Sequence, residues 1–486
     1  MLRGAIGGVS MLPPLTEMNL AKALDLGEAL RLAFGHLERG RPAEARRLAR
    51  QLEHQRPGLP GLAYLLGLIA LAEGEGRKAA QHLAKALQQT PDASPPLLAM
   101  ARAQANQGRD PEAEGYYRRL VAVAPDSAEA MGELAELLLR AGRASEAVAP
   151  LRHATVLRPR WAAALNNLGV AERTIGRSQA AALAFARAVD AQPGLAKAHA
   201  NLAATLRRLG RPDEAAASAL RAVVMQPAEA VHWFELAEAL GGCGEAGPAD
   251  AYARALRLDP ADGLGASLAL ARLGAAPVPA RAPDAFVRTL FDQYAERFDQ
   301  DLVERLGYAG PAVLADSVRR IAGEGPLDII DIGCGTGLAG VALLPLARRL
   351  DGVDISGHMA ARASARGVYD NVTVGELTET LLQRPRGYDL VSAADVLIYL
   401  GDLAPIFAAV AMALRPGGCF AATVEAVAGE GYCVQASGRF AHSAAYLYAV
   451  AGQAGLTLVL MEEQPVRREH GEAVPGFVFV ARKPAG

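Results

Sequence analysis

The residues best suited to chemistry are three alternating glycines next to a short apolar stretch. Leu327 to Ile332 predicts a buried strand, and Asp331-Ile-Gly333-Cys-Gly335-Thr-Gly337 lies at its end. Glycines in such a loop let a ligand lie against bare backbone at the start of the next helix. A second apolar stretch ends at Asp354, 19 residues after Gly335. That separation is expected of a carboxylate that binds the two hydroxyl groups of a ribose.

The same glycines also satisfy a second pattern. Gly335-Thr-Gly337-Leu-Ala-Gly340 matches G-x-G-x-x-G, which is typical of dinucleotide sites but is weak by itself. Against it, Gly333 begins the loop earlier than a dinucleotide site would, and no room remains for a second nucleotide-binding half and a substrate domain. The chain also ends in two predicted strands, Thr457–Glu462 and Phe477–Ala481, which we expect a long loop to separate.

From about residue 284 to 483 the sequence instead resembles the class I S-adenosylmethionine-dependent methyltransferases. The resemblance rests on the Asp331–Gly337 loop, on Asp354 and on the Arg415-Pro-Gly-Gly418 turn before a strand. It implies a Rossmann-like α/β domain with a seven-stranded, mostly parallel sheet and an antiparallel terminal strand. It also implies S-adenosylmethionine as the cofactor.

The resemblance assigns cofactor contacts residue by residue. Asp331 would face the amino group of the cofactor, either directly or through water, and a helix around Leu290–Asp299 would cover its methionine end. The implied cofactor-binding residues are Gly333, Gly335 and Gly337 in the loop, Asp354 and Ile355 at the ribose, Glu376 and Leu377 beside the adenine, Asp331, and Tyr294 and Phe298 of the covering helix.

Three residues are candidates for the acceptor side. A predicted fourth strand, Tyr388 to Asp395, would bring Asp395 to the rim where the methyl group is transferred, although a helix cap or loop turn is the competing interpretation. In the polar stretch from Tyr432 to Ser443, expected to be a loop, Arg439 would bind an acidic acceptor and His442 would take its proton. No His/Asp/Glu cluster indicates a metal site, and no Asn/Asp-Pro-Pro-aromatic motif indicates methylation of nucleic-acid bases.

A repeat with a period of 34 residues fills the first half of the chain. Glycines recur at residues 40, 74, 108, 142, 176, 210 and 244, and alanines and prolines keep the same step. Each unit is predicted to be a helical hairpin, because the glycine ends its first helix and the proline ends its second. The pattern resembles a tetratricopeptide repeat array of about seven units. Such a helical solenoid commonly binds peptides on its concave face.

The composition of the chain bears on its partners, its disulfides and its location. The chain has 486 residues, 51% of them hydrophobic, with a formal charge of -2 and four scattered cysteines. A net charge close to zero disfavours nucleic acid as a partner, and the cysteines are too few for a disulfide framework. No apolar run is long enough to span a membrane. A cytoplasmic protein is therefore expected.

These observations predict four segments and one function. The segments are an N-terminal tail (1–25), the repeat array with a capping helix (26–273), a linker (274–283) and a methyltransferase domain (284–486). We expect an S-adenosylmethionine-dependent methyltransferase whose array binds a protein or peptide. Two alternatives stay open: a small-molecule O- or N-methyltransferase whose array serves oligomerisation or docking, and a non-catalytic scaffold. The oligomeric state and the acceptor atom are left open.

Overall fold

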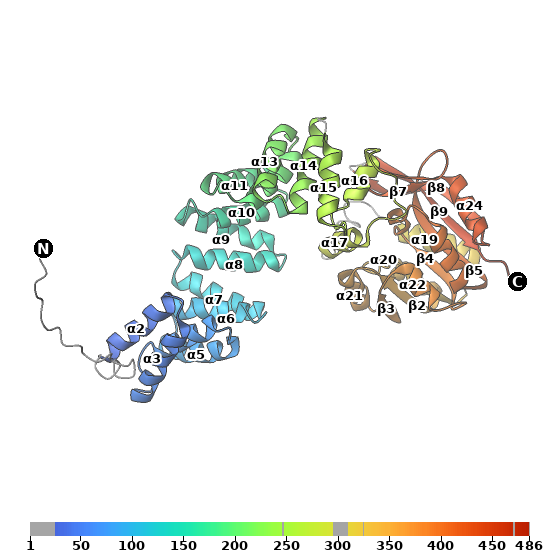
Figure 1. The fold of residues 1–486 in the computed structure, drawn as a ribbon. Helices are drawn as coiled ribbons and strands as arrows, with labels where there is room; N and C mark the ends of the chain where they lie inside the picture. The colour runs from blue at the N-terminus through green and yellow to red at the C-terminus, as the bar shows by residue number, and fades with distance from the viewer. Residues whose placement is uncertain (1–24, 245–246, 295–309, 324, 470–471, 486) are drawn as a thin grey trace, which may run out of the picture. The chain divides into compact units, whose positions relative to one another are not determined.

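The computed structural model describes residues 25–244, 247–294, 310–323, 325–469 and 472–485. The chain divides into two compact units, residues 1–218 and 219–486, and the division falls inside a helix of the repeat array. Figure 1 gives the labels of the helices and strands.

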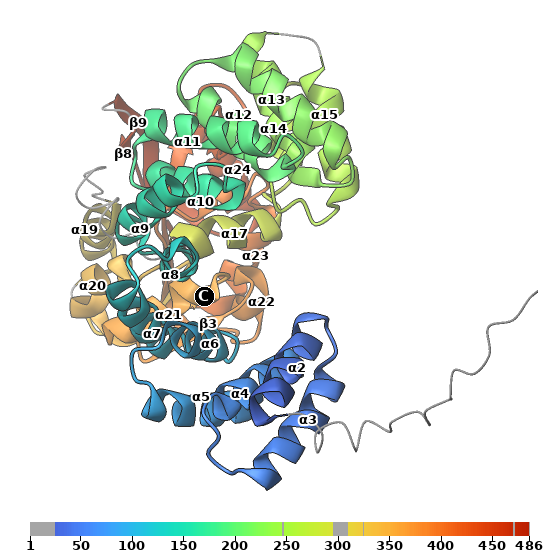
Figure 2. The ribbon, with the colours of Figure 1, turned by 90° about the vertical axis from the view of Figure 1, so that its left-hand side faces the viewer.

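The first unit consists of helices that pack in consecutive pairs (Figure 2). Their bounds are α2 (Leu26–Glu38), α3 (Pro42–Gln55), α4 (Leu62–Ala72), α5 (Gly76–Gln89), α6 (Ser94–Ala105), α7 (Asp110–Val123), α8 (Ala128–Arg140), α9 (Ala144–Leu157), α10 (Ala162–Thr174), α11 (Ser178–Ala191), α12 (Ala196–Arg208) and α13 (Pro212–Met225), the last of which reaches into the second unit. This confirms the predicted helical hairpins.

The repeated residues have the roles that the period predicts. All seven glycines of the 34-residue series have a positive φ, between 69° and 84°, a backbone conformation that L side chains rarely adopt. At several of these glycines, the N–H of the following residue donates a hydrogen bond to a carbonyl in the last turn of the preceding helix. Arg41 N donates to His36 O, and Arg143 N donates to Leu138 O. The matching alanines, such as Ala45 and Ala147, are fully buried because the paired helices approach closely there.

The second unit begins with the last repeat helices and continues into an α/β domain. The repeat helices are α14 (Ala230–Cys243), α15 (Pro248–Leu258) and the short α16 (Ala266–Arg272). Asp262 caps α16, because its carboxylate accepts hydrogen bonds from Ala266 N (2.6 Å) and Ser267 N (2.9 Å).

A largely parallel sheet forms the centre of the α/β domain. Its strands are β1 (Leu327–Ile332), β2 (Ala347–Asp354), β3 (Asn371–Val374), β4 (Tyr388–Ala393), β5 (Leu414–Ala426), β6 (Tyr432–Val434), β7 (Phe440–His442), β8 (Thr457–Glu469) and β9 (Glu472–Arg482). The parallel strands lie in the order β3-β2-β1-β4-β5, and β9 pairs antiparallel with both β5 and β8. Among the described residues the sheet has nine strands: the predicted seven, β1–β5, β8 and the antiparallel β9, and in addition the hairpin of β6 and β7.

Helices cover this sheet and complete its core. They are α17 (Asp284–Tyr294), α19 (Gly310–Ala322), α20 (Leu338–Leu343), α21 (Gly357–Arg366), α22 (Leu377–Leu382), α23 (Ala404–Ala413) and α24 (Ala444–Gln453), with short 3-10 turns η2 (Leu344–Leu346) and η3 (Leu397–Tyr399). The core between α23, β5 and β9 contains a cluster of three aromatic rings, Phe407, Phe420 and Phe479.

Three local expectations are wrong. The polar stretch after β5 is the hairpin of β6 and β7, and β7 pairs with the end of β5. The long loop expected between the last strands is absent, because β8 and β9 keep pairing as far as Glu469 and Glu472. Arg415–Gly418 lies within β5 as an irregularity, since the register with β4 jumps from Leu414 to Cys419.

Residues 274–283 join the repeats to the α/β domain and pair with it. Ala280 O accepts hydrogen bonds from Gly401 N (2.8 Å) and Asp402 N (2.7 Å), and Ala282 N donates to Tyr399 O (2.8 Å). The end of the segment expected to be a linker is therefore bonded to the chain after β4. The domain boundaries themselves stay predictions.

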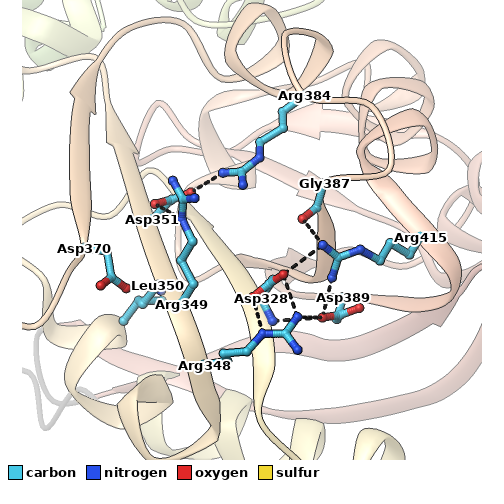
Figure 3. A network of polar contacts seen from close by, with 10 residues as sticks. All are labelled: Asp328, Arg348, Arg349, Leu350, Asp351, Asp370, Arg384, Gly387, Asp389 and Arg415. Atoms are coloured by element: carbon cyan, nitrogen blue, oxygen red, sulfur yellow. Dashed lines mark hydrogen bonds and ion pairs between the residues drawn. The ribbon is translucent and has the colours of Figure 1, made fainter.

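Two clusters of ion pairs tie together the starts of the central strands, as Figure 3 shows. Arg415 of β5 donates to Asp389 of β4 (2.7 Å) and to Asp328 of β1 (2.8 Å), and Arg348 of β2 donates to both oxygens of Asp328. These arginines, Arg348 first, hold the pKa of Asp328 well below its usual range. The second cluster has Asp351 as the acceptor from Arg349, Arg384 and Tyr388. The first cluster lies where β1, β2, β4 and β5 begin, whereas Asp351 lies farther along β2.

Within the described ranges, no helix combines the length and apolar character needed to cross a membrane.

Candidate functional site

The glycine loop begins where β1 ends and is bonded to the neighbouring strand β2. Gly333 N and Cys334 N both donate to Val353 O, at 2.8 and 3.0 Å. Gly333 has φ 67°, and a Cβ at this position would lie 2.3 Å from a methyl carbon of Val396, just after β4. Any larger residue would therefore strain the backbone and push the chain after β4 away.

Asp354, at the end of β2, is buried and points back at this loop. Its Oδ2 accepts a hydrogen bond from Gly335 N (2.9 Å), and its Oδ1 accepts one from Ser356 N (2.9 Å). Burial raises the pKa of this carboxyl above its usual value, while backbone N–H donors, those of Ser356 and Gly335 foremost, act in the opposite direction. A carboxylate offers about four acceptor positions, so the two backbone bonds leave positions for the hydroxyl groups of a ligand.

A cavity of about 170 Å³ opens beside the loop. Of the sequence-predicted residues, eight line it: Gly333, Gly335, Asp354, Ile355, Glu376, Leu377, Asp395 and Arg439. Together they bring the carboxyl ends of β1, β2, β3 and β4 and the β6–β7 hairpin to one place. Parallel strands place ligand-binding residues at this edge of a sheet.

Glu376 fulfils a structural task as well as lining the cavity. Its Oε2 accepts a hydrogen bond from Glu379 N (2.8 Å) and so caps α22. Its Oε1 lies 3.5 Å from the guanidinium of Arg281, which belongs to the segment expected to be a linker. The carboxylate is thus oriented from two sides.

Asp395 lies two residues beyond β4 in a constrained conformation. Its φ of 56° is uncommon for a residue other than glycine. The hydroxyl of the buried Thr423 accepts a hydrogen bond from Asp395 N (2.8 Å) and is 3.2 Å from Asp395 Oδ1, to which it donates. Strained residues of this kind cluster at active sites and ligand clamps.

The structure does not bring Asp331 to the cavity wall. Its side chain is fully buried, and its oxygens accept hydrogen bonds from Tyr369 Oη (2.7 Å) and Ser392 Oγ (3.1 Å). Burial raises the pKa of Asp331 to about 6. Tyr369 in turn packs against Gly340, where an added Cβ would lie 2.4 Å from the ring. Asp331 therefore fixes Tyr369, which packs against Gly340 of α20. A contact between Asp331 and a cofactor stays a prediction.

His442 is likewise not part of the cavity lining. The imidazole is fully buried in β7, its Nε2 lies 3.1 Å from Gly401 O, and its ring stacks on Tyr446. Burial lowers the pKa of His442 to about 4. A general base must reach the proton that it abstracts. In this arrangement the imidazole instead fixes the chain after η3, which is a positioning role that the sequence reasoning missed.

Of the remaining predicted residues, one is described away from the lining, and the side chains of two lie outside the described part of the chain. Gly337 has φ 92° and caps α20, so it shapes the loop without facing the cavity. The side chain of Tyr294, at the end of α17, lies outside the described residues, and so does Phe298.

The sequence reasoning missed a wall formed by residues before β1 and after β4. Arg281 and Asp284 form an ion pair beside the cavity, and Phe291 of α17 makes an edge-to-face contact with Tyr399, with ring centroids 5.4 Å apart. The one available signal was the pair of charged residues within a stretch otherwise composed of proline, alanine and valine. Among the described residues, no group of three or more His, Cys, Asp or Glu side chains is arranged to hold a metal ion.

Comparison with known protein families identifies both parts of the chain. A family model described as a methyltransferase domain matches residues 330–420, which include the glycine loop, Asp354 and Asp395. Two models described as tetratricopeptide repeats match residues 70–130, and residues 30–94 and 151–196. The chain carries tetratricopeptide repeats and a methyltransferase domain.

Curated relatives match the methyltransferase domain over part of their length. A ubiquinone biosynthesis O-methyltransferase from Methylobacterium sp. (strain 4-46) is 32% identical over 127 residues, which are 25% of this chain and 51% of that protein. Methyltransferase-like protein 27 from Homo sapiens is 33% identical over 100 residues, 20% of this chain and 40% of that protein. The chain thus spans about half the length of the curated relatives that it matches.

Among solved structures, a 1,6-didemethyltoxoflavin-N1-methyltransferase from Burkholderia thailandensis is similar to this chain. It is 19% identical, with a TM-score of 0.35, and the match covers 43% of this chain and 93% of that protein. That structure contains 1,6-didemethyltoxoflavin and S-adenosylhomocysteine.

Proposed function

We propose that this protein transfers a methyl group from S-adenosylmethionine to an acceptor bound at the carboxyl end of β4. One observation carries the proposal: the carboxylate of Asp354 is fixed against the backbone of the glycine loop and lines the cavity. A ribose on that carboxylate would place the rest of the cofactor along Gly333 and Gly335, which have no side chains of their own.

The charges around the cavity agree with a cationic ligand. The carboxylates of Asp284, Asp354, Glu376 and Asp395 line it, against the guanidinium groups of Arg281 and Arg439. An excess of carboxylates in a partly desolvated cleft attracts positive charge. The residues present therefore fit S-adenosylmethionine better than a dinucleotide with two negatively charged phosphates.

When bound, the cofactor supplies a methyl group on a positively charged sulfur. The contribution of the chain is then to align the acceptor and exclude water, which supplies most of the acceleration in such displacements. Asp395, which lines the cavity after β4, is the carboxylate that we assign to aligning the acceptor. It accepts a proton only if the acceptor must lose one during the transfer. Arg439 binds an acidic group of the acceptor. The buried His442 has no part in this proposal.

The tetratricopeptide repeats are proposed to bind a protein or peptide in the cytoplasm, either the acceptor or a docking partner. A small-molecule acceptor is the second candidate. It is favoured by the names of the curated relatives, two of which are ubiquinone biosynthesis O-methyltransferases. The array would then serve docking or oligomerisation. A non-catalytic scaffold is disfavoured by the constrained conformation of Asp395 at the cavity.

Calorimetry with three full-length chains tests the cofactor proposal. Asp354→Ala removes a charge-assisted contact of about 1.5–3 kcal/mol, so the affinity for S-adenosylmethionine should fall about tenfold or more. Asp316→Ala, an exposed aspartate on α19, is the matched control and should bind like the parent. Equal affinities in all three chains would remove Asp354 from the site.

A label-transfer experiment separates the acceptor classes. The parent chain is incubated with S-adenosylmethionine carrying a radioactive methyl group and with whole lysate, and macromolecules are then separated from small metabolites. Label in the protein fraction supports a protein acceptor, and label in the metabolite fraction supports the small-molecule candidate. Absence of label in both fractions, with the cofactor bound, would favour the scaffold.

A further inference from the structure

The last helix of the repeat array contacts the hairpin that carries Arg439. Arg272, in the final turn of α16, donates a hydrogen bond from Nη1 to Ala436 O, at 3.2 Å. Ala436 lies in the turn between β6 and β7, and the two partners are 164 residues apart in the sequence. The repeats and the cavity wall are thus joined by a specific polar contact.

Arg272 is itself held by the two preceding repeat helices. Its guanidinium lies 3.7 Å from Glu238 of α14, and Glu238 accepts a hydrogen bond from the hydroxyl of Tyr252 in α15. A planar guanidinium with several fixed donors can contact a carboxylate and a carbonyl at the same time. The side chain therefore links α14 and α15 to the β6–β7 turn.

The turn that Arg272 contacts determines where Arg439 lies. Gln435 N donates to Arg439 O (2.7 Å), and Gly438 N donates to Gln435 O (2.9 Å), so residues 435–439 form a closed turn. Arg439 lines the cavity and lies 3.8 Å from the buried carboxylate of Glu425. A displacement of the turn would move the guanidinium of Arg439 along the cavity wall.

Apolar packing supports the same junction. Leu268 of α16 is buried in a cluster with Ile398, Tyr399 and Phe440. A Cβ on Gly265, directly before α16, would lie 3.0 Å from the ring of Phe286 in α17. This packing places α16 against the wall, whereas the hydrogen bond of Arg272 sets the position of the turn.

We propose that Arg272 is a positioning residue for the acceptor side of the cavity and that it acts through Ala436 on Arg439. The last helix of the repeat array, α16, therefore completes the wall of the methyltransferase domain. This inference rests on the proposed methyl transfer only for its effect on the acceptor. The effect on the β6–β7 turn is independent of that function.

The test uses the full chain with Arg272→Ala, Arg272→Lys and the control Arg254→Ala, an exposed arginine on α15. Amide hydrogen exchange, followed by mass spectrometry, reports on residues 435–440. Loss of one hydrogen bond should raise exchange there about fivefold in Arg272→Ala, and Arg272→Lys should restore part of the protection because its ammonium group can still donate to Ala436 O. Arg254→Ala should exchange like the parent.

Activity supplies the second readout. In Arg272→Ala, the amount of the lysate fraction that gives half-maximal label transfer should rise about fivefold, while the maximal rate and the affinity for S-adenosylmethionine stay near the parent values. Parent-like exchange in Arg272→Ala would overturn the inference and leave the proposed function intact. Failure of the parent to bind S-adenosylmethionine would overturn the proposed function, and the exchange result would still decide the role of Arg272. If Arg272→Ala does not fold, exchange in Arg272→Lys decides, and a value equal to the parent's in every segment except 435–440 is the supporting result.

Discussion

His442→Gln should flatten the pH dependence of stability of the methyltransferase domain. The imidazole is buried against Tyr446 and the Gly401 carbonyl, and burial lowers its pKa from an ordinary value near 6.5 to about 4. Glutamine can keep a donor for that carbonyl but does not titrate. The substitution therefore removes the proton uptake and keeps one hydrogen bond.

The expected magnitude follows from the two pKa values. Below pH 6.5 His442 is protonated in the unfolded chain, but in the folded chain it stays neutral until the pH falls to about 4. Stability is therefore fully present above pH 6.5 and is lost as the pH falls through this window. Each pH unit in the window removes about 1.4 kcal/mol, so His442 alone should account for roughly 3 kcal/mol between pH 6.5 and 4.5.

Urea unfolding of the full chain at pH 7.5, 6.5, 5.5 and 4.5 measures this effect. The parent should lose about 3 kcal/mol more than His442→Gln between the two ends of the series, because all other titrating groups are common to both chains. His153→Gln is the control, since His153 is an exposed residue of α9, and it should follow the parent. Parallel curves for the parent and His442→Gln would refute the assignment of a buried, neutral imidazole.

Three further outcomes are expected. Gly333→Ala should weaken binding of S-adenosylmethionine in calorimetry because its Cβ would lie 2.3 Å from Val396, and Val396→Ala should recover part of the loss; a tight Gly333→Ala variant would contradict the account of the loop. Arg415→Ala leaves Asp328 and Asp389 without one donor each and should lower the free energy of unfolding by about 1–3 kcal/mol in urea, with less effect at pH 3, where Asp328 in the unfolded chain becomes protonated; a pH-independent loss would count against the ion pairs. A fragment of residues 274–486 should be less stable to heat than one of residues 212–486, because it lacks Leu268 and Arg272, and equal melting temperatures would show that α16 is dispensable.

Much of the fold could be predicted because its signals are local. The 34-residue glycine series is repeated seven times, and each glycine has the positive φ that made glycine necessary. β1 matches its predicted bounds because its apolar residues, Leu327, Ile329, Ile330 and Ile332, end directly before the glycine loop. The place of the cavity could be predicted for the same reason, since Gly333 directly follows β1 and Asp354 is the last residue of β2.

The arrangement of the β6–β7 hairpin beside the cavity could not be predicted because its contacts are between residues far apart in sequence. The stretch from Tyr432 to Ser443 is too polar to suggest strands, yet it pairs with the end of β5. His442 is buried by Tyr432 and Tyr446 and by a carbonyl 41 residues earlier, which no local pattern reveals. Ala280 and Ala282 lie among prolines that are typical of a linker, but their own carbonyl and N–H groups make the bonds to the chain after β4.

A crystal structure of the full chain with S-adenosylhomocysteine tests the central claim most directly. The account predicts that the ribose hydroxyl groups lie within hydrogen-bond distance of Asp354, that the adenine lies on the side of Glu376 and Leu377, and that the homocysteine end runs along Gly333 and Gly335. Asp395 should then face the sulfur from the acceptor side. A ligand bound elsewhere, or a ribose without contact to Asp354, would contradict the account.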